Sequence, residues 1–316
     1  MYNLENFGKN PRLTESILAT LEDQMNRSAR WLPKLKHKVR LYLPLIKSLQ
    51  TFLLLATGLA GYMSARCPIF HLPTLLGLSG SLFLAISGST VLNMWWDRDI
   101  DAKMGRTQKR PLPSGELSSQ ETFRLGLVLS VIGLGWSALL SPLYALVVFA
   151  GWFFDVVVYT IWLKRRTCWS IVWGGIAGGM PILAGRVLGV GSIDLIGILL
   201  TLSVLFWIPT HILTFAMRFY SDYQHAGVPT FPSCYGFPVT RATIAASSVL
   251  AAFAIGTASI LIGVQWGFLR LLVVLSSGLL LLAIGSLIRP NERVNFGLFK
   301  YASLYMLASM ILLSIQ

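Results

Sequence analysis

Three oxygen-bearing side chains, Asn93, Asp97 and Asp101, stand four residues apart where a long apolar run ends. At this spacing they fall within an arc of roughly 80° on one helical face, so they converge on one point. A basic segment that contains Arg106 and Arg110 follows directly. Converging oxygens flanked by cations suit a polyphosphate bound with magnesium.

These charges have an ordinary alternative explanation, because acids and bases commonly end membrane spans. Two observations count against it. Asp at a membrane edge is unfavourable by roughly 2 to 3 kcal/mol on insertion scales unless a partner compensates it. A boundary also needs no helical register, whereas Asn93, Asp97 and Asp101 share one. The register therefore favours a binding site.

A second acidic segment, around Asp222, follows four predicted helices later. Asp97 and Lys164 are separated by 67 residues, as are Asp222 and Arg289. Matching positions in two halves are typical of an internally duplicated membrane fold whose substrate site lies between the halves. Coincidence of a single spacing is the alternative.

His211, Phe215, Arg218 and Asp222 form one stripe along a predicted helix, at offsets of 0, 4, 7 and 11 residues. His211 lies about 16 Å deeper than Asp222 at a rise of 1.5 Å per residue. Two hypotheses fit this histidine. It is a core residue hydrogen-bonded to a neighbouring helix, or it contacts an acceptor substrate or that substrate's metal.

A third cluster, Tyr159 to Thr167, contains Lys164, Arg165 and Arg166 in a short turn between two predicted spans. Such a basic turn is ordinary as a topogenic signal. Tyr159 and Lys164 are also close enough in sequence to hydrogen-bond one diphosphate from a helix end. Both roles remain open for this cluster.

The composition identifies the class of protein. Hydrophobic residues make up 54% of the 316 residues and charged residues 12%, with a mean hydropathy of +0.65, outside the range of soluble domains. An all-α, polytopic membrane bundle of about nine helices is therefore predicted. The apolar stretches long enough to span cover residues 42–63, 73–96, 122–140, 142–162, 168–189, 193–217, 242–263, 266–287 and 299–315.

The charged residues indicate how the protein is oriented in the membrane and what it binds. The net charge of +13 is spread over loops between spans rather than along one soluble face, which favours membrane lipids and a polyphosphate and excludes nucleic acid. Most Lys and Arg residues fall in loops of one parity, so the N-terminus and the acidic segments are predicted to be cytoplasmic. Residues 1–41 contain acids and lack a signal-peptide core, which predicts a cytoplasmic leader before a transmembrane domain over 42–316.

Three segments resemble the UbiA-type intramembrane prenyltransferases and, within that family, the protoheme IX farnesyltransferases or haem O synthases. Residues 93–115 match the pattern Asn-x-x-x-Asp-x-x-x-Asp followed by Arg-Pro-Leu. Residues 159–167 resemble the Tyr-Thr-x-x-Leu-Lys-Arg-Arg-Thr segment of the haem branch. Residues 222–229 resemble its Asp-Tyr-x-x-Ala-Gly-x-Pro segment. The likeness runs from about residue 45 to 240.

The resemblance implies a fold of two four-helix-like halves around a central cavity. It also implies a transferase of heme biosynthesis, located in a bacterial or archaeal plasma membrane. The implied reaction transfers farnesyl from farnesyl diphosphate to a vinyl group of haem B, giving haem O. The implied Mg²⁺ ligands are Asn93, Asp97, Asp101 and Asp222, which act in catalysis together with Lys164. The implied substrate-binding residues are Arg106, Arg110, Tyr159, Arg165, His211 and Arg218.

The sequence departs from the haem branch near His211. The usual Trp-x-Pro-Pro-His-Phe-Trp reads Trp207-Ile-Pro-Thr-His-Ile-Leu213, and Ser221 replaces an acid. These changes are predicted to fall in the acceptor pocket, so a quinone-precursor ring or a lipid-like alcohol stays open as acceptor. A transporter is the alternative from another class. It predicts polar residues near helix centres, whereas the polar groups here gather at one set of helix ends.

Overall fold

The computed structural model describes residues 38–65 and 71–315, and all regular structure in these ranges is helical. Most of the predicted leader, residues 1–37, lies outside them. Residues 45–316 belong to one compact unit, to which the description below refers. Its helices are α2 (Ser48–Met63), α3 (Leu72–Trp96), α4 (Arg98–Asp101), α5 (Ser119–Leu140), α6 (Pro142–Phe153), η3 (Phe154–Leu163), α7 (Ser170–Val190), α8 (Leu195–Arg218), α9 (Tyr220–His225), α10 (Phe231–Ile262), α11 (Trp266–Ile288) and α12 (Glu292–Ser314).

Eight helices in the described residues are long and apolar enough to cross a membrane, where α6 and η3 count as one. There are up to nine if the bent pair Lys38–Ile46 and Ser48–Met63 counts as one span. The prediction of about nine spans is therefore confirmed.

The predicted first residues of two helices were wrong because they followed hydropathy alone. The last helix begins at Glu292 rather than 299, where the Asn291 side chain accepts a hydrogen bond from the Arg293 N–H at 2.8 Å. The seventh begins at Phe231 rather than 242 and continues through a kink at Gly236.

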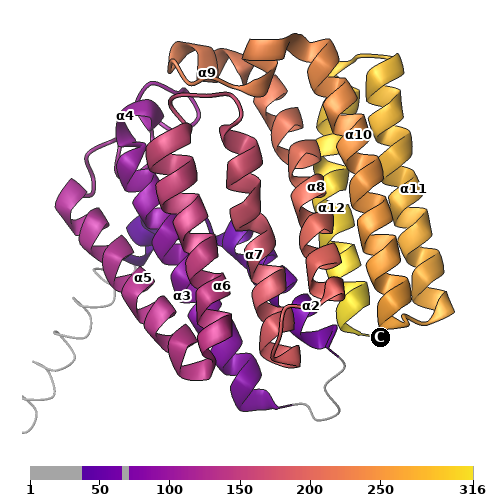
Figure 1. The fold of residues 1–316 in the computed structure, drawn as a ribbon. Coiled ribbons are helices and arrows are strands. Elements are labelled where there is room, and N and C mark those ends of the chain that lie inside the picture. The colour runs from indigo at the N-terminus through magenta and orange to yellow at the C-terminus, as the bar shows by residue number, and fades with distance from the viewer. Residues whose placement is uncertain (1–37, 66–70, 316) are drawn as a thin grey trace, which may run out of the picture. The chain divides into compact units, whose positions relative to one another are not determined.

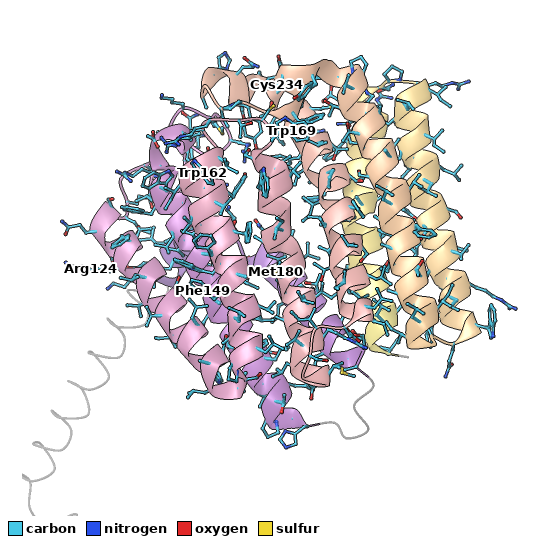
Figure 2. The ribbon with its side chains drawn as sticks, in the orientation of Figure 1. Arg124, Phe149, Trp162, Trp169, Met180 and Cys234 are labelled. Atoms are coloured by element: carbon cyan, nitrogen blue, oxygen red, sulfur yellow. The ribbon has the colours of Figure 1, made fainter. Side chains whose placement is uncertain are left out.

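The outer surface is apolar along the helices, as the side chains in Figure 2 show. Phe149, Trp162 and Trp169 are each about half exposed. Exposed aromatic and aliphatic side chains on every long helix suit contact with lipid rather than water. The protein is therefore an integral, multi-pass membrane protein.

The bundle has two halves, with α3, α5 and α6 in one and α8, α10, α11 and α12 in the other (Figure 1). Each half has its own hydrophobic core. One core joins α2, α3, α6 and α7, and the other is built mainly from α8, α10, α11 and α12. The predicted pair of halves is thus observed, with α2 and α7 in the middle. These two helices touch backbone to backbone, because a Cβ on Gly185 would lie 1.8 Å from the Gly58 carbonyl oxygen. Small residues permit such close helix contact in membranes.

The polar residues singled out above gather at one end of the bundle. We call the end that carries residues 97–118 and 219–230 the polar end; α4 and α9 mark it in Figure 1. Helices α3 and α8 run towards this end, whereas α10 and α12 start from it. Segments far apart in sequence therefore meet there.

Candidate active site

Asn93, Asp97 and Asp101 keep one helical register although α3 ends at Trp96. Asp97 donates its N–H to the Asn93 carbonyl at 2.9 Å, and Asp101 donates to the Asp97 carbonyl at 2.8 Å, so the turn continues into α4. All three side chains are buried and line one cavity of about 360 Å³, which we call the polar cavity. The predicted convergence on one face is observed.

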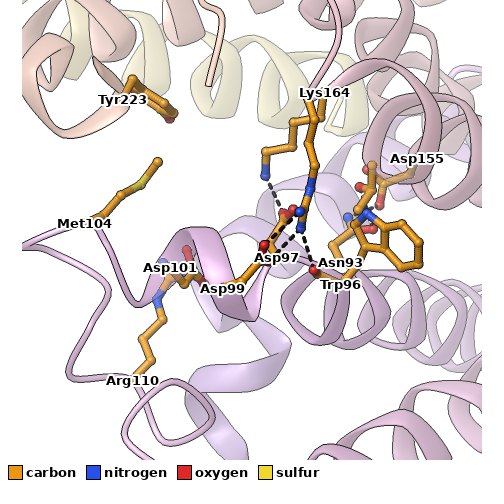
Figure 3. A network of polar contacts seen from close by, with 12 residues as sticks. Asn93, Trp96, Asp97, Asp99, Asp101, Met104, Arg110, Asp155, Lys164 and Tyr223 are labelled. Atoms are coloured by element: carbon orange, nitrogen blue, oxygen red, sulfur yellow. Dashed lines mark hydrogen bonds and ion pairs between the residues drawn. The ribbon is translucent and has the colours of Figure 1, made fainter. Parts of the chain in front are cut away.

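Two of the acids already have cationic partners (Figure 3). Lys164 Nζ donates to Asp97 Oδ2, and Arg110 Nη1 donates to Asp101 Oδ2 at 2.8 Å. Burial opposes the charged form of Lys164, but the neighbouring Tyr159 and Asp97 outweigh burial and raise the pKa of Lys164. Asp97 Oδ1 is buried and makes no hydrogen bond to any described residue. An orphaned carboxylate oxygen in a cavity wall is a position that a cation fits.

Arg165 lies differently from the sequence prediction of a substrate contact. Its guanidinium holds both carboxylate oxygens of Asp99, at 2.7 and 2.8 Å, and the Trp96 carbonyl. The hydrogen bonds from Arg165 lower the pKa of Asp99. Arg165 does not line the polar cavity, and its contacts fasten the turn after η3 to the end of α3.

Asp222 approaches the first motif from α9 through Arg106. Arg106 Nε lies 3.9 Å from Asp222 Oδ2, and Arg106 Nη2 donates to the Tyr223 hydroxyl at 3.3 Å. Arg106 lines the polar cavity, whereas Asp222 does not. No cluster of three or more His, Cys, Asp or Glu side chains close enough to hold a metal occurs in residues 38–65 and 71–315. Among the ion pairs of these residues none joins Asp222 to Arg289, so the 67-residue spacing is matched by contact only in the first half.

The segment Phe154–Leu163 is a π-helix, which sequence reasoning missed. Lys164 donates its N–H to the Tyr159 carbonyl at 2.8 Å, a bond to the fifth preceding residue. In an α-helix Lys164 would lie about 140° around the axis from Tyr159. The wider turn instead places the Lys164 ammonium 5.6 Å from the Tyr159 ring centre, and both residues line the polar cavity.

Asp155 is a further polar residue of the site that the sequence prediction missed. Asn93 Nδ2 donates to Asp155 Oδ2 at 2.8 Å, and the Thr160 hydroxyl donates to Asn93 Oδ1 at 2.8 Å. Both polar ends of the Asn93 amide are therefore occupied. Lys47 also lines the cavity from the start of α2. A signal existed, because Lys47 and Asp155 are ionisable residues inside predicted spans, and such residues are expected to be functional.

A second, mostly apolar cavity of about 550 Å³ lies deeper between the halves, and we call it the apolar cavity. It extends along α2, α3, α6, α7, α8 and α12. The two cavities share the wall residues Gln50, Asp155, Tyr159, Ile171, His211, Ile212 and Phe299. A charged compartment therefore adjoins an oily one of a size that admits small-molecule ligands.

The structure fits the first hypothesis for His211, a core residue hydrogen-bonded to a neighbouring helix, whereas its contact with an acceptor stays a prediction. Its Nδ1 lies 3.2 Å from the Ser303 hydroxyl of α12, and its ring stacks between Trp207, at 5.0 Å, and Phe299, at 4.6 Å. It is thus a hydrogen-bonded histidine of the helix interface, and it also forms part of the wall of both cavities. Its Nε2 makes no hydrogen bond to any described residue.

Arg218 and Thr210 lie outside both cavity walls. Arg218 sits at the end of α8 against Phe296 and Glu292 of α12. The Thr210 hydroxyl bonds to Ser248 of α10 at 2.8 Å. The Thr210 side chain thus points into the α8–α10 interface, whereas Ile212, another departure of the same segment, lines both cavities. That these departures fall in the acceptor pocket stays a prediction.

Comparison with known proteins gives a consistent result. The UbiA prenyltransferase family matches residues 54–306. A protoheme IX farnesyltransferase of Korarchaeum cryptofilum is 44% identical over 215 residues, which cover 68% of this chain and 72% of the relative. One from Archaeoglobus fulgidus is 40% identical over 277 residues, covering 87% of this chain and 95% of the relative.

Solved structures share the fold at low sequence identity. A digeranylgeranylglyceryl phosphate synthase superposes with a TM-score of 0.73 at 20% identity, covering 88% of this chain and 98% of the other. A UbiA homologue from Archaeoglobus fulgidus bound to DMAPP and Mg²⁺ gives 0.65 at 15% identity, covering 87% and 100%. That homologue therefore holds a prenyl diphosphate and a divalent metal on the same architecture.

Proposed function

The chain belongs to the UbiA prenyltransferase family and is an intramembrane prenyltransferase, and from this premise we propose that it transfers farnesyl from farnesyl diphosphate to a vinyl group of haem B, giving haem O. Farnesyl C1 bonds the outer vinyl carbon as diphosphate leaves, and water then adds a hydroxyl to the inner vinyl carbon and releases a proton. The observation that carries this proposal is the pair of adjoining cavities with a shared wall, one charged and one apolar. A prenyl diphosphate has the same two parts. The names of the relatives support haem B as acceptor.

The polar cavity takes the diphosphate. Lys164 and Arg110 are held in its wall by Asp97 and Asp101, and Arg106 lines the same cavity. These cations hydrogen-bond the leaving group as its negative charge develops. Their present carboxylate partners are replaceable contacts, since an incoming diphosphate offers the same kind of acceptor oxygens.

Magnesium fits the same wall. Asp97, with its unpartnered Oδ1, and Asp101 would hold Mg²⁺, with Asn93 and Asp222 as the further predicted ligands. The ion, when bound, neutralises charge on the diphosphate. Asn93 is engaged by Asp155 and Thr160, and Asp222 by Arg106, so both have to exchange partners to serve as ligands.

The apolar cavity takes the farnesyl chain and the reacting edge of the acceptor. Its wall includes Trp152, Tyr159 and Phe299, whose ring faces stabilise a nearby allylic cation. Exclusion of water from this cavity protects the cation from premature capture. His211, with Nε2 unpartnered, is the polar group of this wall that we assign to the acceptor.

We place the protein in the plasma membrane of a bacterium or archaeon with the polar end at the cytoplasmic face. The basic residues of the loops at this end support the orientation. Farnesyl diphosphate is charged at physiological pH, so a polar cavity at the cytoplasmic end suits a substrate that arrives from the aqueous side.

The test uses the purified full chain in detergent with Mg²⁺, farnesyl diphosphate and haem B, followed by mass spectrometry of the tetrapyrrole. The expected product is farnesylated haem, formed only when both Mg²⁺ and farnesyl diphosphate are present. Arg289→Gln, an exposed substitution outside both cavities, is the matched control and should retain activity. Prenylation of a quinone-precursor ring or a lipid-like alcohol, with haem B unchanged, would contradict the proposal.

A further inference from the structure

Two cations flank one aromatic ring beside the polar cavity, and the proposed diphosphate site does not use them. Arg218 lies 3.8 Å above the Phe296 ring centre, and the Lys300 ammonium lies 4.5 Å from the same centre. Arg218 comes from the last turn of α8, whereas Phe296 and Lys300 are one turn apart on α12. Neither cation lines the polar cavity, where Lys164 and Arg110 stand.

This cation pair is only weakly neutralised. Its one carboxylate neighbour among the described ion pairs is Glu292, 4.0 Å from Arg218, with a side chain that is 78% exposed. Lys300 is exposed and makes no ion pair with any described residue. An exposed pair at this distance contributes little. The two cations are therefore available to a carboxylate from outside the chain.

A run of nearly parallel rings joins the cation pair to the cavities. The rings of Phe296 and Phe299 are 6.1 Å apart and inclined by 9°, and Phe299 stacks on His211 at 4.6 Å and 23°. Phe296, Phe299, Lys300 and Ser303 follow the spacing of one helical face, and Phe299 and Ser303 line the apolar cavity. Arg218 and Lys300 thus lie at one end of this row of aromatic rings, which we call the aromatic wall.

The distances along α8 suit a planar ligand. Arg218 lies seven residues after His211, or about 10 Å along the helix axis. A flat aromatic molecule packed against this wall would meet His211 and Phe299 with its ring and the two cations with one edge. The opposite edge would then point into the apolar cavity, where the prenyl chain is proposed to lie.

We propose that Arg218 and Lys300 form a carboxylate subsite that orients the acceptor, a planar aromatic ring with acidic substituents on one edge. This inference rests on the proposed function, because haem B carries two propionates on the edge opposite its vinyl groups. Charge-assisted contacts to the propionates hold the porphyrin so that a vinyl group faces the prenyl donor. The subsite is separate from the diphosphate cations, so it governs which acceptor is used.

The test compares haem B with its dimethyl ester, in which both propionates are neutral. Steady-state rates are measured for the wild-type chain, Arg218→Gln, Lys300→Gln and the control Arg289→Gln. The wild-type chain should prefer the diacid by roughly tenfold or more in kcat/KM, the scale of one charge-assisted hydrogen bond. Each subsite variant should raise KM for haem B by a similar factor, leave the ester almost unaffected and so abolish the preference. The control should keep it.

Equal use of diacid and ester by the wild-type chain would overturn the subsite. Equal losses on both substrates in the two variants would also overturn it, since such losses indicate a structural role. A wild-type chain that prenylates no haem at all refutes the proposed function instead. In that case, spectroscopic titration with haem B and with the ester tests the subsite by itself, and equal affinities would refute it.

Discussion

The contact between Lys164 and Asp97 yields a prediction that separates folding from catalysis. Asp97 is 6% exposed and Lys164 20%, and Asp97 Oδ1 has no partner among the described residues. Lys164→Met removes the one cation that bonds this carboxylate. Removal of one partner from a buried ion pair costs about 3 to 5 kcal/mol, because the other charge stays buried alone. The variant should unfold correspondingly more easily in detergent.

Asp97→Asn should lower the free energy of unfolding by less, about 1 to 2 kcal/mol, because its amide oxygen still accepts a hydrogen bond from Lys164. The double variant contains neither charge, so it should be more stable than Lys164→Met alone by about 2 kcal/mol or more. Turnover behaves differently. All three variants should lose roughly 10² or more in turnover, because the same groups act on the diphosphate in the transition state.

Stability is measured by denaturant or thermal unfolding in detergent without substrate, and turnover by farnesylation of haem B. A double variant whose stability loss equals the sum of the single losses within about 0.5 kcal/mol would refute the assigned coupling. Near-normal turnover in Asp97→Asn would refute the assignment of this residue to the site.

Asp222→Asn should lower turnover and raise the magnesium concentration needed for half-maximal activity. If the magnesium titration is unchanged and activity is full, Asp222 only anchors Arg106. His211→Ala should weaken haem B binding or conversion while farnesyl diphosphate binding changes little; equal losses in both ligand titrations would mark it as a packing residue only. Asp194→Asn should destabilise the end of the bundle opposite the polar end by about 1 to 2 kcal/mol at pH 7, because Asp194 accepts from Arg186 at 2.6 Å and caps α8. Partial burial alone would raise the pKa of Asp194, but Arg186 and the Gly197 N–H outweigh it and hold that pKa below its usual range. A lowered carboxyl pKa stabilises the fold above the unfolded value of about 3.9, and the contribution is lost as pH falls towards the folded pKa. Unfolding curves of wild type and variant should therefore converge below about pH 4, and a constant difference down to pH 2 would contradict the assignment.

Local patterns determined much of this protein. The spans could be predicted because uninterrupted apolar length is a property of each segment by itself. The shared face of Asn93, Asp97 and Asp101 could be predicted because helical periodicity relates residues four apart without help from the rest of the chain. The break after Trp96 left that register intact, since the backbone hydrogen bonds continue through Asp97.

Tertiary structure decided the partners of those residues. Lys164 meets Asp97, Asp155 meets Asn93 and Ser303 meets His211 across more than 60 residues of sequence. Such contacts depend on which helices pack together and at what depth. Hydropathy and periodicity within one segment carry no information about either.

The π-helix shows the physical reason most clearly. An α-helical register, the default for any span, turns Lys164 away from Tyr159, whereas one wider turn brings both into the polar cavity. The mostly hydrophobic residues of this segment are compatible with either winding, so the sequence determined a membrane-spanning helix here. Packing against α3 and α7, together with the bond from Lys164 to Asp97, selected the winding that builds the site.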